Sequence, residues 1–565
     1  MNAGSPTRFE GDDPLRVNLD AGLSWTSTIG YGLEARLALR RPKLDDRGWW
    51  RANTAQIQMR QLRRILSTAA DTELGREGGF AKLLGLDDRD LLPAYRQSLP
   101  VRTYEGYRER IVRAREHGER DVFWPGLVQA YAQTSGTTAG DKFMPQSEAM
   151  FKSNYRASLD IFATMMRWGV SIGRLFGGQV LFLGGSSAVD ENEHGVRTGD
   201  LSGLVMPLIH WPLTKVYSPG ADIALMDDWP EKIEAMAQRT IDQDVRMISG
   251  MPSWSGVLLE RLLALGKERG RKADRVRDLW PNFFVFVHGG VKYAPFKHHL
   301  TELIEGEGAD DLPMRLELYP ASEAFVAIQD EPWDPSLRLC ADIGNFFEFV
   351  PIEEIESDTP TAHAAWEVEK GQRYVVVLTT CAGLCRYVLG DVVEFDTIPA
   401  GLDGVGGEGP CRLRIVGRHK LFINAFGENL IVEHIETAVG EAAAAVGVKT
   451  GEFTAGPVYP DGDTPAGLEL VIESKLWGDA ADRFRNTFDA SLKQQNVDYT
   501  TKRTDSLGMA PPTVTTVPAG TFHRWMESRG KLGGQNKCPR CANHRDFVEG
   551  VVRIADGQAA GGVLA

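Results

Sequence analysis

Short apolar runs alternate with amphipathic stretches along most of this chain. The runs at 180–183, 283–287 and 374–378 consist of Val, Leu, Phe and Tyr, which is typical of strands whose two faces are both buried. The stretch 254–265 instead spaces its leucines at helical intervals. Buried strands that alternate with helices predict an α/β fold.

Two other regions have patterns of their own. Helical periodicity dominates from about 31 to 92, where Ile57, Leu62, Ile65 and Leu66 form an apolar stripe. A stretch at 399–410 is rich in glycine, proline and acidic residues, and a smaller α+β unit is expected beyond it. The expected elements of that unit are a helix at 431–446, a strand at 468–473, a helix at 479–495 and a strand at 513–517.

The length of 565 residues exceeds what one hydrophobic core supports, so the chain should form two or more domains. We expect a large N-terminal domain with mixed sheets and helices at 26–416 and a small, mobile α+β domain at 417–553. A hinge is expected at 417–420. The ends, 1–25 and 554–565, are expected to be poorly ordered and flexible, respectively.

Composition and charge narrow the classes of partner. Hydrophobic residues make up 42% and charged residues 25% of the chain, and no apolar run approaches the length of a membrane span. The 63 basic and 77 acidic residues leave a net charge of −14, which disfavours nucleic acid and anionic membranes. The polar start lacks the features of a signal peptide. We therefore expect a cytoplasmic protein without nucleic-acid, membrane or obligate protein partners.

The densest cluster of chemistry-bearing residues is the run 134–142, Thr-Ser-Gly-Thr-Thr-Ala-Gly-Asp-Lys. Glycines let the backbone approach a ligand, and hydroxyls and N–H groups donate hydrogen bonds to phosphate oxygens. A P-loop is excluded, because three residues rather than four separate Gly136 from Gly140 and because Phe143 follows Lys142. The run therefore predicts a phosphate-binding loop of another kind, with a polar surface turn as the alternative.

Two further segments carry a carboxylate in an apolar setting. In 316–323, Tyr319 can cover a flat ring and Glu323 can ligate a Mg²⁺ ion that bridges phosphates. In 384–393, Asp391 stands at the expected end of a strand, where its carboxylate can accept hydrogen bonds from two ribose hydroxyls. The alternatives are a surface charge for Glu323 and a turn or helix cap for Asp391.

Three segments give weaker signals. The run 286–291 ends a buried strand in paired glycines, which places bare backbone at the edge of the sheet. The basic cluster at 415–423 stands at the expected domain junction and can act as a hinge beside a ligand. Cys538 and Cys541, with His544 beyond, suggest zinc, but a structural zinc site usually needs a fourth ligand from a second cysteine pair.

Taken in order, four motifs form a set. They are Thr-Ser-Gly-Thr-Thr-x-Gly at 134–140, Tyr-x-x-Ser-Glu at 319–323, Arg-Tyr-x-x-Gly-Asp at 386–391, and Gly-Arg-x-x…Gly-Glu-x-Leu…Glu from 417. This set resembles the adenylate-forming superfamily of acyl ligases. The Tyr-x-x-Ser-Glu form and the ending at 520–540, similar to Gly-Thr-Phe…Asn-Gln-Tyr-Lys-x-Pro-Arg, resemble more narrowly the Gretchen Hagen (auxin-responsive) family of acyl acid amido synthetases, in a bacterial-type form.

The resemblance implies a fold and a set of site residues. The large N-terminal domain would be the adenylate-forming domain, joined to the small mobile α+β C-terminal domain, and the cofactors would be ATP and Mg²⁺. The residues that would act in catalysis are Lys537, Lys420 and Arg418. The residues that would bind the cofactors are Thr134, Ser135, Gly136, Thr137 and Thr138 on the phosphates, Tyr319 and Ser322 at the adenine, Asp391 on the ribose and Glu323 on Mg²⁺.

The resemblance also implies a reaction. A carboxylic acid would be activated as acyl-AMP with release of pyrophosphate, and an amine, expected to be an amino acid, would then take the acyl group to form an amide. An acyl-CoA ligase that uses the same adenylate is the alternative enzyme. A non-catalytic nucleotide-binding protein is the alternative from another class, and the presence of Glu323, Asp391 and a C-terminal lysine argues against it.

Overall fold

The computed structural model describes most of the chain, and every structural statement below concerns the described residues. These residues are 14–134, 142–184, 189–206, 211–226, 229–290, 293–419, 422–423, 430–458, 467–496, 499–500, 503, 509–530, 538–542 and 544–557.

Helices form the N-terminal part of the chain, as the periodicity of 31–92 predicts. Ile57, Leu62, Ile65 and Leu66 are all buried on one face of α4, whose N-terminus is capped by the carboxylate of Asp46 through the Trp49 N–H at 2.7 Å. The helices are α1 (Pro14–Asp20), α2 (Ser27–Leu37), α3 (Arg40–Asp45), α4 (Arg47–Ala69), α5 (Glu73–Glu77), α6 (Phe80–Leu83), α7 (Asp88–Ser98) and α8 (Glu105–Glu116).

Helix α1 lies within 1–25, the segment for which the sequence predicts poor order. Asn18 of this helix is buried, and its amide exchanges two hydrogen bonds with the backbone of Ser171, at 2.9 and 3.1 Å. These bonds hold part of the N-terminal segment against the large domain. The first thirteen residues lie outside the described part of the chain.

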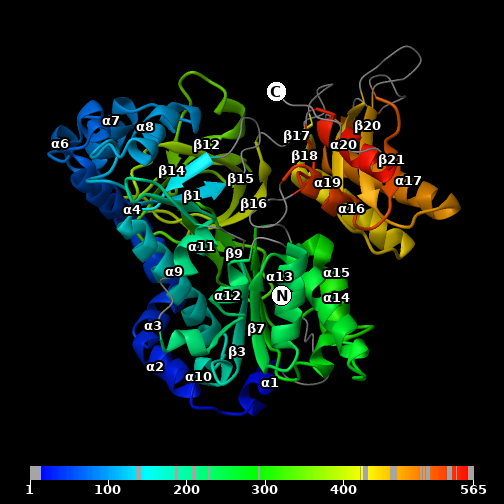
Figure 1. Cartoon of the computed structure of the whole chain (residues 1–565). Coiled ribbons are helices and arrows are strands. Elements are labelled where there is room, and N and C mark those ends of the chain that lie inside the picture. Colours follow the sequence, from blue (N-terminus) through cyan, green and yellow to red (C-terminus); the bar gives the residue numbers. More distant parts are fainter. Residues whose placement is uncertain are drawn as a thin grey trace, which may run out of the picture.

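A sheet of twelve strands forms the centre of the molecule (Figure 1). In spatial order its strands are β13 (His363–Ala364), β12 (Phe346–Pro351), β14 (Tyr374–Thr379), β15 (Tyr387–Thr397), β16 (Arg412–Arg418), β11 (Leu337–Leu339), β10 (Phe325–Gln329), β9 (Arg315–Pro320), β8 (Val285–Gly289), β7 (Val245–Gly250), β3 (Gln179–Leu183) and β6 (Tyr217–Ser218).

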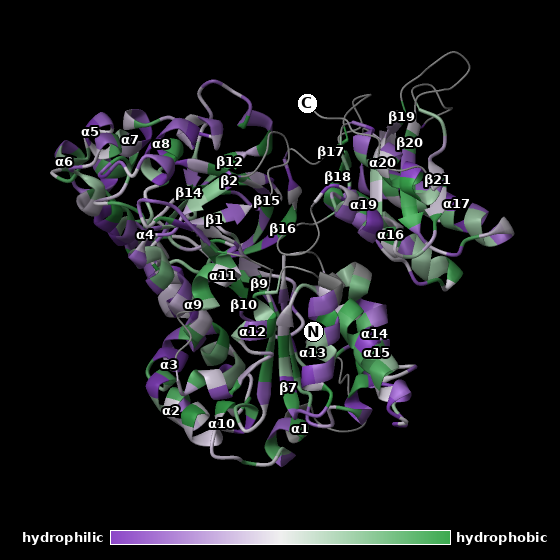
Figure 2. Ribbon diagram, in the orientation of Figure 1, coloured by the Kyte–Doolittle hydropathy of each residue, from purple (hydrophilic) through white to green (hydrophobic). Residues whose placement is uncertain are grey.

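The half of the sheet from β9 to β6 is parallel and has helices on both faces. Phe286 of β8 packs into the apolar cluster formed with α14, whereas its neighbours Val285 and Val287 pack into a cluster on the opposite face. Figure 2 shows these strands as largely hydrophobic and the surrounding helices as mixed. The α/β fold that the apolar runs predict is therefore confirmed.

The remaining helices and short 3-10 turns of the large domain follow α8 along the chain. They are α9 (Glu148–Arg167), α10 (Ile172–Leu175), α11 (Leu201–Val205), η2 (Leu213–Lys215), α12 (Ala221–Ala224), α13 (Trp229–Thr240), α14 (Pro252–Glu268), η3 (Val276–Asp278), η4 (Ala294–Phe296), α15 (Lys297–Glu305) and η5 (Ile352–Glu354).

The half of the sheet from β13 to β9 is antiparallel. The stretch 399–410 joins β15 to β16, which are paired neighbours in this half. Strand β16 then ends at Arg418, beside the expected hinge at 417–420. The boundary that the sequence predicts between 416 and 417 stays a prediction.

A separate small sheet lies beside this half. Its strands, in order, are β2 (Lys142–Pro145), β1 (Ala130–Thr134), β5 (Arg197–Gly199) and β4 (Asp190–Glu191).

The C-terminal unit is α+β, as its pattern predicts, and Figure 1 shows it to one side of the large sheet. Its elements are β17 (Phe422–Ile423), β18 (Leu430–Ile431), α16 (Val432–Val446), β19 (Phe453–Val458), β20 (Gly467–Glu473), α17 (Gly478–Gln495), β21 (Thr513–Val517), α19 (Thr521–Ser528) and α20 (Asp546–Ala555). The ion pair of Lys449 with Glu302 at 2.7 Å links this unit to α15.

A buried ionic cluster ties α3 to the core. The Arg40 guanidinium donates to Asp160 of α9 at 2.6 and 2.7 Å and to Asp342 at 2.7 and 3.0 Å. Burial alone would raise the pKa of the Asp342 carboxyl, but the hydrogen bonds and charge of Arg40 outweigh it and lower that pKa to about 2.

We expect Asp342→Asn to lower the free energy of unfolding at pH 7 by about 2 kcal/mol. The folded pKa of about 2 lies below the ordinary value of 3.8. The stabilisation is therefore present above about pH 4 and is lost as the pH falls through about 2. Urea titrations of both proteins between pH 2 and 7 test this, because the stability of the variant should fall less than that of the wild type across the acidic range. If the free energy of unfolding falls equally with pH in the two proteins, the prediction is wrong.

Among the helices that the structure describes, none has the length and apolar character needed to cross a lipid bilayer.

Candidate active site

Three of the predicted site residues lie at the end of strand β9 and in the turn that follows it. Tyr319 is the next-to-last residue of strand β9, and Ser322 and Glu323 follow in the connection to β10. The turn is closed by a hydrogen bond from the Ala321 N–H to the Ala324 carbonyl at 3.0 Å. The buried amide of Gln146, next to β2, donates to the Ser322 carbonyl at 2.7 Å and fixes the turn against the small sheet.

Strand β8 fixes the other side of this turn. It ends at Gly289, as the paired glycines predict, and Gly289 lies opposite Leu318 of β9. A Cβ atom at this glycine would lie 2.6 Å from the Leu318 carbonyl oxygen. The glycine therefore allows the end of β9, with Tyr319, to approach β8 closely.

Asp391 lies within a strand rather than at its end, which corrects the sequence-based expectation. Strand β15 continues to Thr397 because its residues from Asp391 onward pair with β16, and Asp391 lies opposite Arg418. Gly390 has a φ of +93°, and the buried ring of His419 occupies the space beside it. The backbone turns locally at this glycine while the pairing goes on.

Both oxygens of the Asp391 carboxylate bind protein groups. The Tyr319 hydroxyl donates to Oδ2 at 2.7 Å, and Arg418 Nε donates to Oδ1 at 2.5 Å. Burial and the charge of Asp391 raise the pKa of the Tyr319 phenol well above its usual value, so this hydroxyl stays protonated and donates. The Asp391 side chain is 12% exposed and that of Arg418 is 46% exposed, so the arginine approaches from the solvent side.

These contacts require the large sheet to curl. Three strands, β16, β11 and β10, separate β15 from β9 in the sheet. Four spacings of about 4.8 Å would place the two strands roughly 19 Å apart in a flat sheet. The bond between Tyr319 and Asp391 therefore shows that the sheet bends around the site.

Glu323 is a buried carboxylate between charged neighbours. It is 9% exposed, and the hydroxyl of Tyr387 at the start of β15 donates to its Oε1 at 3.3 Å. Burial raises the pKa of the Glu323 carboxyl, and the charge of Asp391 adds to this. The hydrogen bond from its own N–H and the charges of Arg418 and Lys142 oppose the shift.

The predicted phosphate loop is described at its two ends. Thr134 ends β1 and lies opposite Lys142, which begins β2, and the two strands pair antiparallel. Ser135, Gly136, Thr137 and Thr138 lie outside the described residues. The Lys142 ammonium lies 5.8 Å from the ring centroid of Tyr104, whose hydroxyl accepts from the Phe143 N–H at 3.0 Å. The charge of Lys142 also acts on the Glu323 carboxyl, which places the base of the loop near Glu323.

The carboxylates can be tested as ligands for Mg²⁺. Within the described part of the chain, no group of three or more His, Cys, Asp or Glu side chains is arranged to hold a metal ion. Mg²⁺ is commonly held by one or two carboxylates together with phosphate oxygens and water. A buried glutamate whose pKa is raised by burial and by a second carboxylate fits this use, because a cation beside it would stabilise its charged form.

Lys420 and Lys537 lie outside the described residues, so the structure does not place them. The segment that follows Lys537 is described. The Ala455 N–H donates to the Arg540 carbonyl at 2.9 Å, and the Ala542 N–H donates to the Ala455 carbonyl at 3.0 Å, which aligns the segment with β19. Neither Cys538 nor Cys541 forms a disulfide among the described residues.

Sequence reasoning assigned no role to Tyr387 or Gln146, which both contact the site. Tyr387 stands inside the Arg-Tyr-x-x-Gly-Asp motif, so the motif carried a signal for it. Gln146 follows the phosphate loop without any distinctive pattern, and only the three-dimensional contact with Ser322 reveals it.

Comparison with protein families gives three matches along the chain. The model of the GH3 family N-terminal domain matches residues 50–219 and 186–308, that of the GH3 family central domain matches 339–400, and that of the GH3 family C-terminal domain matches 433–546. Together these models cover more than half of the chain.

Similar proteins include plant enzymes. The probable indole-3-acetic acid-amido synthetase GH3.1 of Arabidopsis thaliana is 24% identical over 566 residues, which covers 88% of this chain and 90% of the relative. The jasmonoyl–L-amino acid synthetase JAR6 of Nicotiana attenuata is 26% identical over 283 residues, which covers 48% of this chain and 46% of the relative.

Solved structures share the fold. The GH3.15 acyl acid amido synthetase matches with a TM-score of 0.71 and 19% identity, over 92% of this chain and 96% of that one. A 2-hydroxyisobutyryl-CoA ligase in the postadenylation state matches with a TM-score of 0.51 and 14% identity, over 89% and 92% of the two chains.

Proposed function

The chain belongs to the GH3 family, as its ordered motifs predict, and on that premise we propose that it is an ATP-dependent acyl acid amido synthetase. Its substrates are a small carboxylic acid and an amine. We take the amine to be an amino acid, because one relative is named a probable indole-3-acetic acid-amido synthetase and another a jasmonoyl–L-amino acid synthetase. We place the reaction in the cytoplasm.

The reaction has two balanced steps. A carboxylate oxygen attacks the α-phosphorus of ATP, and pyrophosphate leaves with the electron pair of the broken P–O bond. A neutral amine then attacks the acyl carbon, AMP leaves, and the amine loses a proton to give the amide. A free carboxylate is a poor electrophile because oxide is a poor leaving group, and the adenylate replaces oxide by AMP.

The observation that carries the proposal is that the curled sheet brings two carboxylates from distant segments, Asp391 and Glu323, to one site. Asp391 is held by Tyr319 and Arg418, and Glu323 follows Tyr319 in the turn after β9. In our proposal the Asp391 carboxylate accepts hydrogen bonds from the ribose hydroxyls. These bonds replace the one that the exposed Arg418 donates in the structure. Tyr319 and Ser322 line the adenine.

Other roles rest on the family motifs. Thr134 and the loop residues Ser135, Gly136, Thr137 and Thr138 are proposed to bind the ATP phosphates. Glu323 is the proposed protein ligand of Mg²⁺, which would neutralise charge on the phosphates when bound. Lys537 is proposed to contact the α-phosphate, and Arg418 and Lys420 are proposed to lie at the hinge near the ribose and phosphates. Rotation of the small domain about this hinge is proposed to move Lys537 out between the two steps.

A screen of carboxylic acids tests this proposal. The purified protein is incubated with ATP, Mg²⁺ and each acid, and released pyrophosphate is measured. We expect release with a restricted set of acids, followed by amides, detected by mass spectrometry, when mixed amino acids are added. No pyrophosphate with any acid of a broad panel would contradict the proposal.

A second arm of the screen separates the two acceptor classes. Coenzyme A replaces the amino acids in reactions with the same acid, and the products are compared. We expect amides and no thioester. A thioester formed in place of an amide would overturn the acceptor that we propose and would leave the adenylation step intact.

A further inference from the structure

Two segments of the chain meet at the site, and each supplies one tyrosine and one carboxylate with the same spacing. Tyr319 and Glu323 stand four residues apart around the β9–β10 turn, and Tyr387 and Asp391 stand four residues apart in β15. Each tyrosine hydroxyl donates to the carboxylate of the other segment, at 2.7 Å for Tyr319 and 3.3 Å for Tyr387. The pairing is therefore reciprocal.

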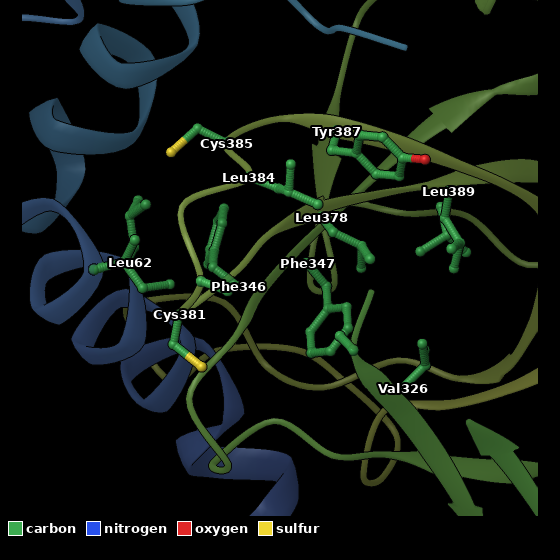
Figure 3. Packing of buried hydrophobic residues seen from close by; sticks show 14 of the residues in the cluster. Leu62, Val326, Phe346, Phe347, Leu378, Cys381, Leu384, Cys385, Tyr387 and Leu389 are labelled. Atoms are coloured by element: carbon green, nitrogen blue, oxygen red, sulfur yellow. The ribbon is translucent and has the colours of Figure 1, made fainter. Parts of the chain in front are cut away.

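The backbone around Tyr387 is held from both sides. The preceding carbonyl, of Arg386, accepts from the Arg102 N–H at 2.9 Å, and the following N–H, of Val388, donates to the Arg102 carbonyl at 2.8 Å. The Tyr387 side chain is 1% exposed and lies in an edge contact with the ring of Tyr107. Figure 3 shows it in the apolar cluster beside Leu384, with its hydroxyl directed away from that residue.

Arg386 adopts a backbone conformation that residues other than glycine rarely take. Its φ is +52°, in the left-handed region, which costs about 1–3 kcal/mol when the surroundings impose it. Its buried guanidinium donates to the carbonyls of Arg96 and Leu99 at 2.8 and 2.7 Å and to Glu348 at 3.2 Å. These bonds hold the strained residue directly before Tyr387, at the start of β15.

We propose that Tyr387 is a positioning residue for Glu323. Its hydroxyl fixes the orientation of the carboxylate that would face Mg²⁺, as the Tyr319 hydroxyl fixes Asp391 for the ribose. A ligating carboxylate needs such a partner, because the loss of one costs about 10–100-fold in metal affinity or activity. This inference rests on the proposed function and adds a residue and a role to it.

Tyr387→Phe tests the inference, because it removes the hydroxyl and keeps the ring. ATP binding is measured by calorimetry over a series of Mg²⁺ concentrations, without an acyl substrate. We expect the Mg²⁺ concentration needed for half-maximal ATP binding to rise about tenfold. An unchanged midpoint would overturn the positioning role.

Tyr374→Phe is the matched control. Tyr374 lies in β14, next to β15, is 1% exposed, and donates its hydroxyl hydrogen to Gln372 at 2.9 Å, away from the site. We expect this variant to lose stability to a similar degree and to keep the wild-type Mg²⁺ midpoint. If both variants shift the midpoint equally, Tyr387 acts through general stability and the inference fails.

Glu323→Gln identifies the residue through which Tyr387 acts. If Tyr387 works by orienting this carboxylate, Tyr387→Phe should change the midpoint little in the Glu323→Gln background. A full tenfold effect in that background would overturn the inference. A wild-type protein that binds no ATP at any Mg²⁺ concentration would overturn the proposed function and this role together, whereas an effect missing only in Tyr387→Phe overturns this role alone.

Discussion

Lys537→Ala should lower carboxylate-dependent ATP–pyrophosphate exchange by about 100- to 1,000-fold. In the proposed adenylation step negative charge builds on the α-phosphate oxygens as the carboxylate attacks. A lysine directed at these oxygens stabilises that charge more in the transition state than in bound ATP, so its loss lowers the rate of the step. Exchange of labelled pyrophosphate into ATP, measured with an accepted acid, reads this step alone.

Lys531→Ala is the control for Lys537→Ala, because it removes the same charge from the same segment of the chain. We expect exchange by this variant to stay close to the wild-type rate. Amide formation from preformed acyl-AMP should survive in Lys537→Ala, since that step needs no attack on phosphorus. Wild-type exchange by Lys537→Ala would show that its role is assigned wrongly.

Asp391→Ala should weaken ATP binding by about 100-fold or more. The change removes the proposed acceptor of the ribose hydroxyls and leaves the Tyr319 hydroxyl and the Arg418 guanidinium without their shared partner. Calorimetry with ATP and saturating Mg²⁺ measures the loss. The Mg²⁺ midpoint should change less than the affinity, because Glu323 keeps its own partner.

Asp396→Asn provides the comparison for Asp391→Ala. Asp396 lies in the same strand and accepts from Arg414 Nε at 2.9 Å, so it has a similar arginine partner at a position outside the site. We expect its ATP affinity to equal that of the wild type. If the wild type, Asp391→Ala and Asp396→Asn all bind ATP with equal affinity, Asp391 does not bind the ribose.

The apolar pattern predicted most of the regular elements because burial on both faces leaves a strong local signal. The run 283–287 overlaps β8, and 374–378 lies inside β14. The strand expected at 513–517 is β21 with the same bounds, and the helix expected at 479–495 is α17 with one more residue at its start. These elements follow from periodicity within a few residues of sequence.

The geometry of the site could not be predicted in this way, because it depends on contacts between distant segments. Asp391 was expected at a strand end, and its strand continues because β16 pairs with it across the glycine-rich connection. The bond from Tyr387 to Glu323 joins residues 64 positions apart. It depends on the curl of a twelve-stranded sheet, which no local pattern encodes.

The central claim is that the carboxylate is activated as an acyl adenylate before the amide forms. An accepted acid labelled with oxygen-18 in its carboxylate is incubated with the protein, ATP and an amino acid. The oxygen-18 content of the nucleotide product is then measured by mass spectrometry. Attack on the α-phosphorus transfers one carboxylate oxygen to AMP when the amine displaces it. We expect one labelled oxygen in AMP for each amide formed, whereas unlabelled AMP, or label in inorganic phosphate with release of ADP, would contradict the account.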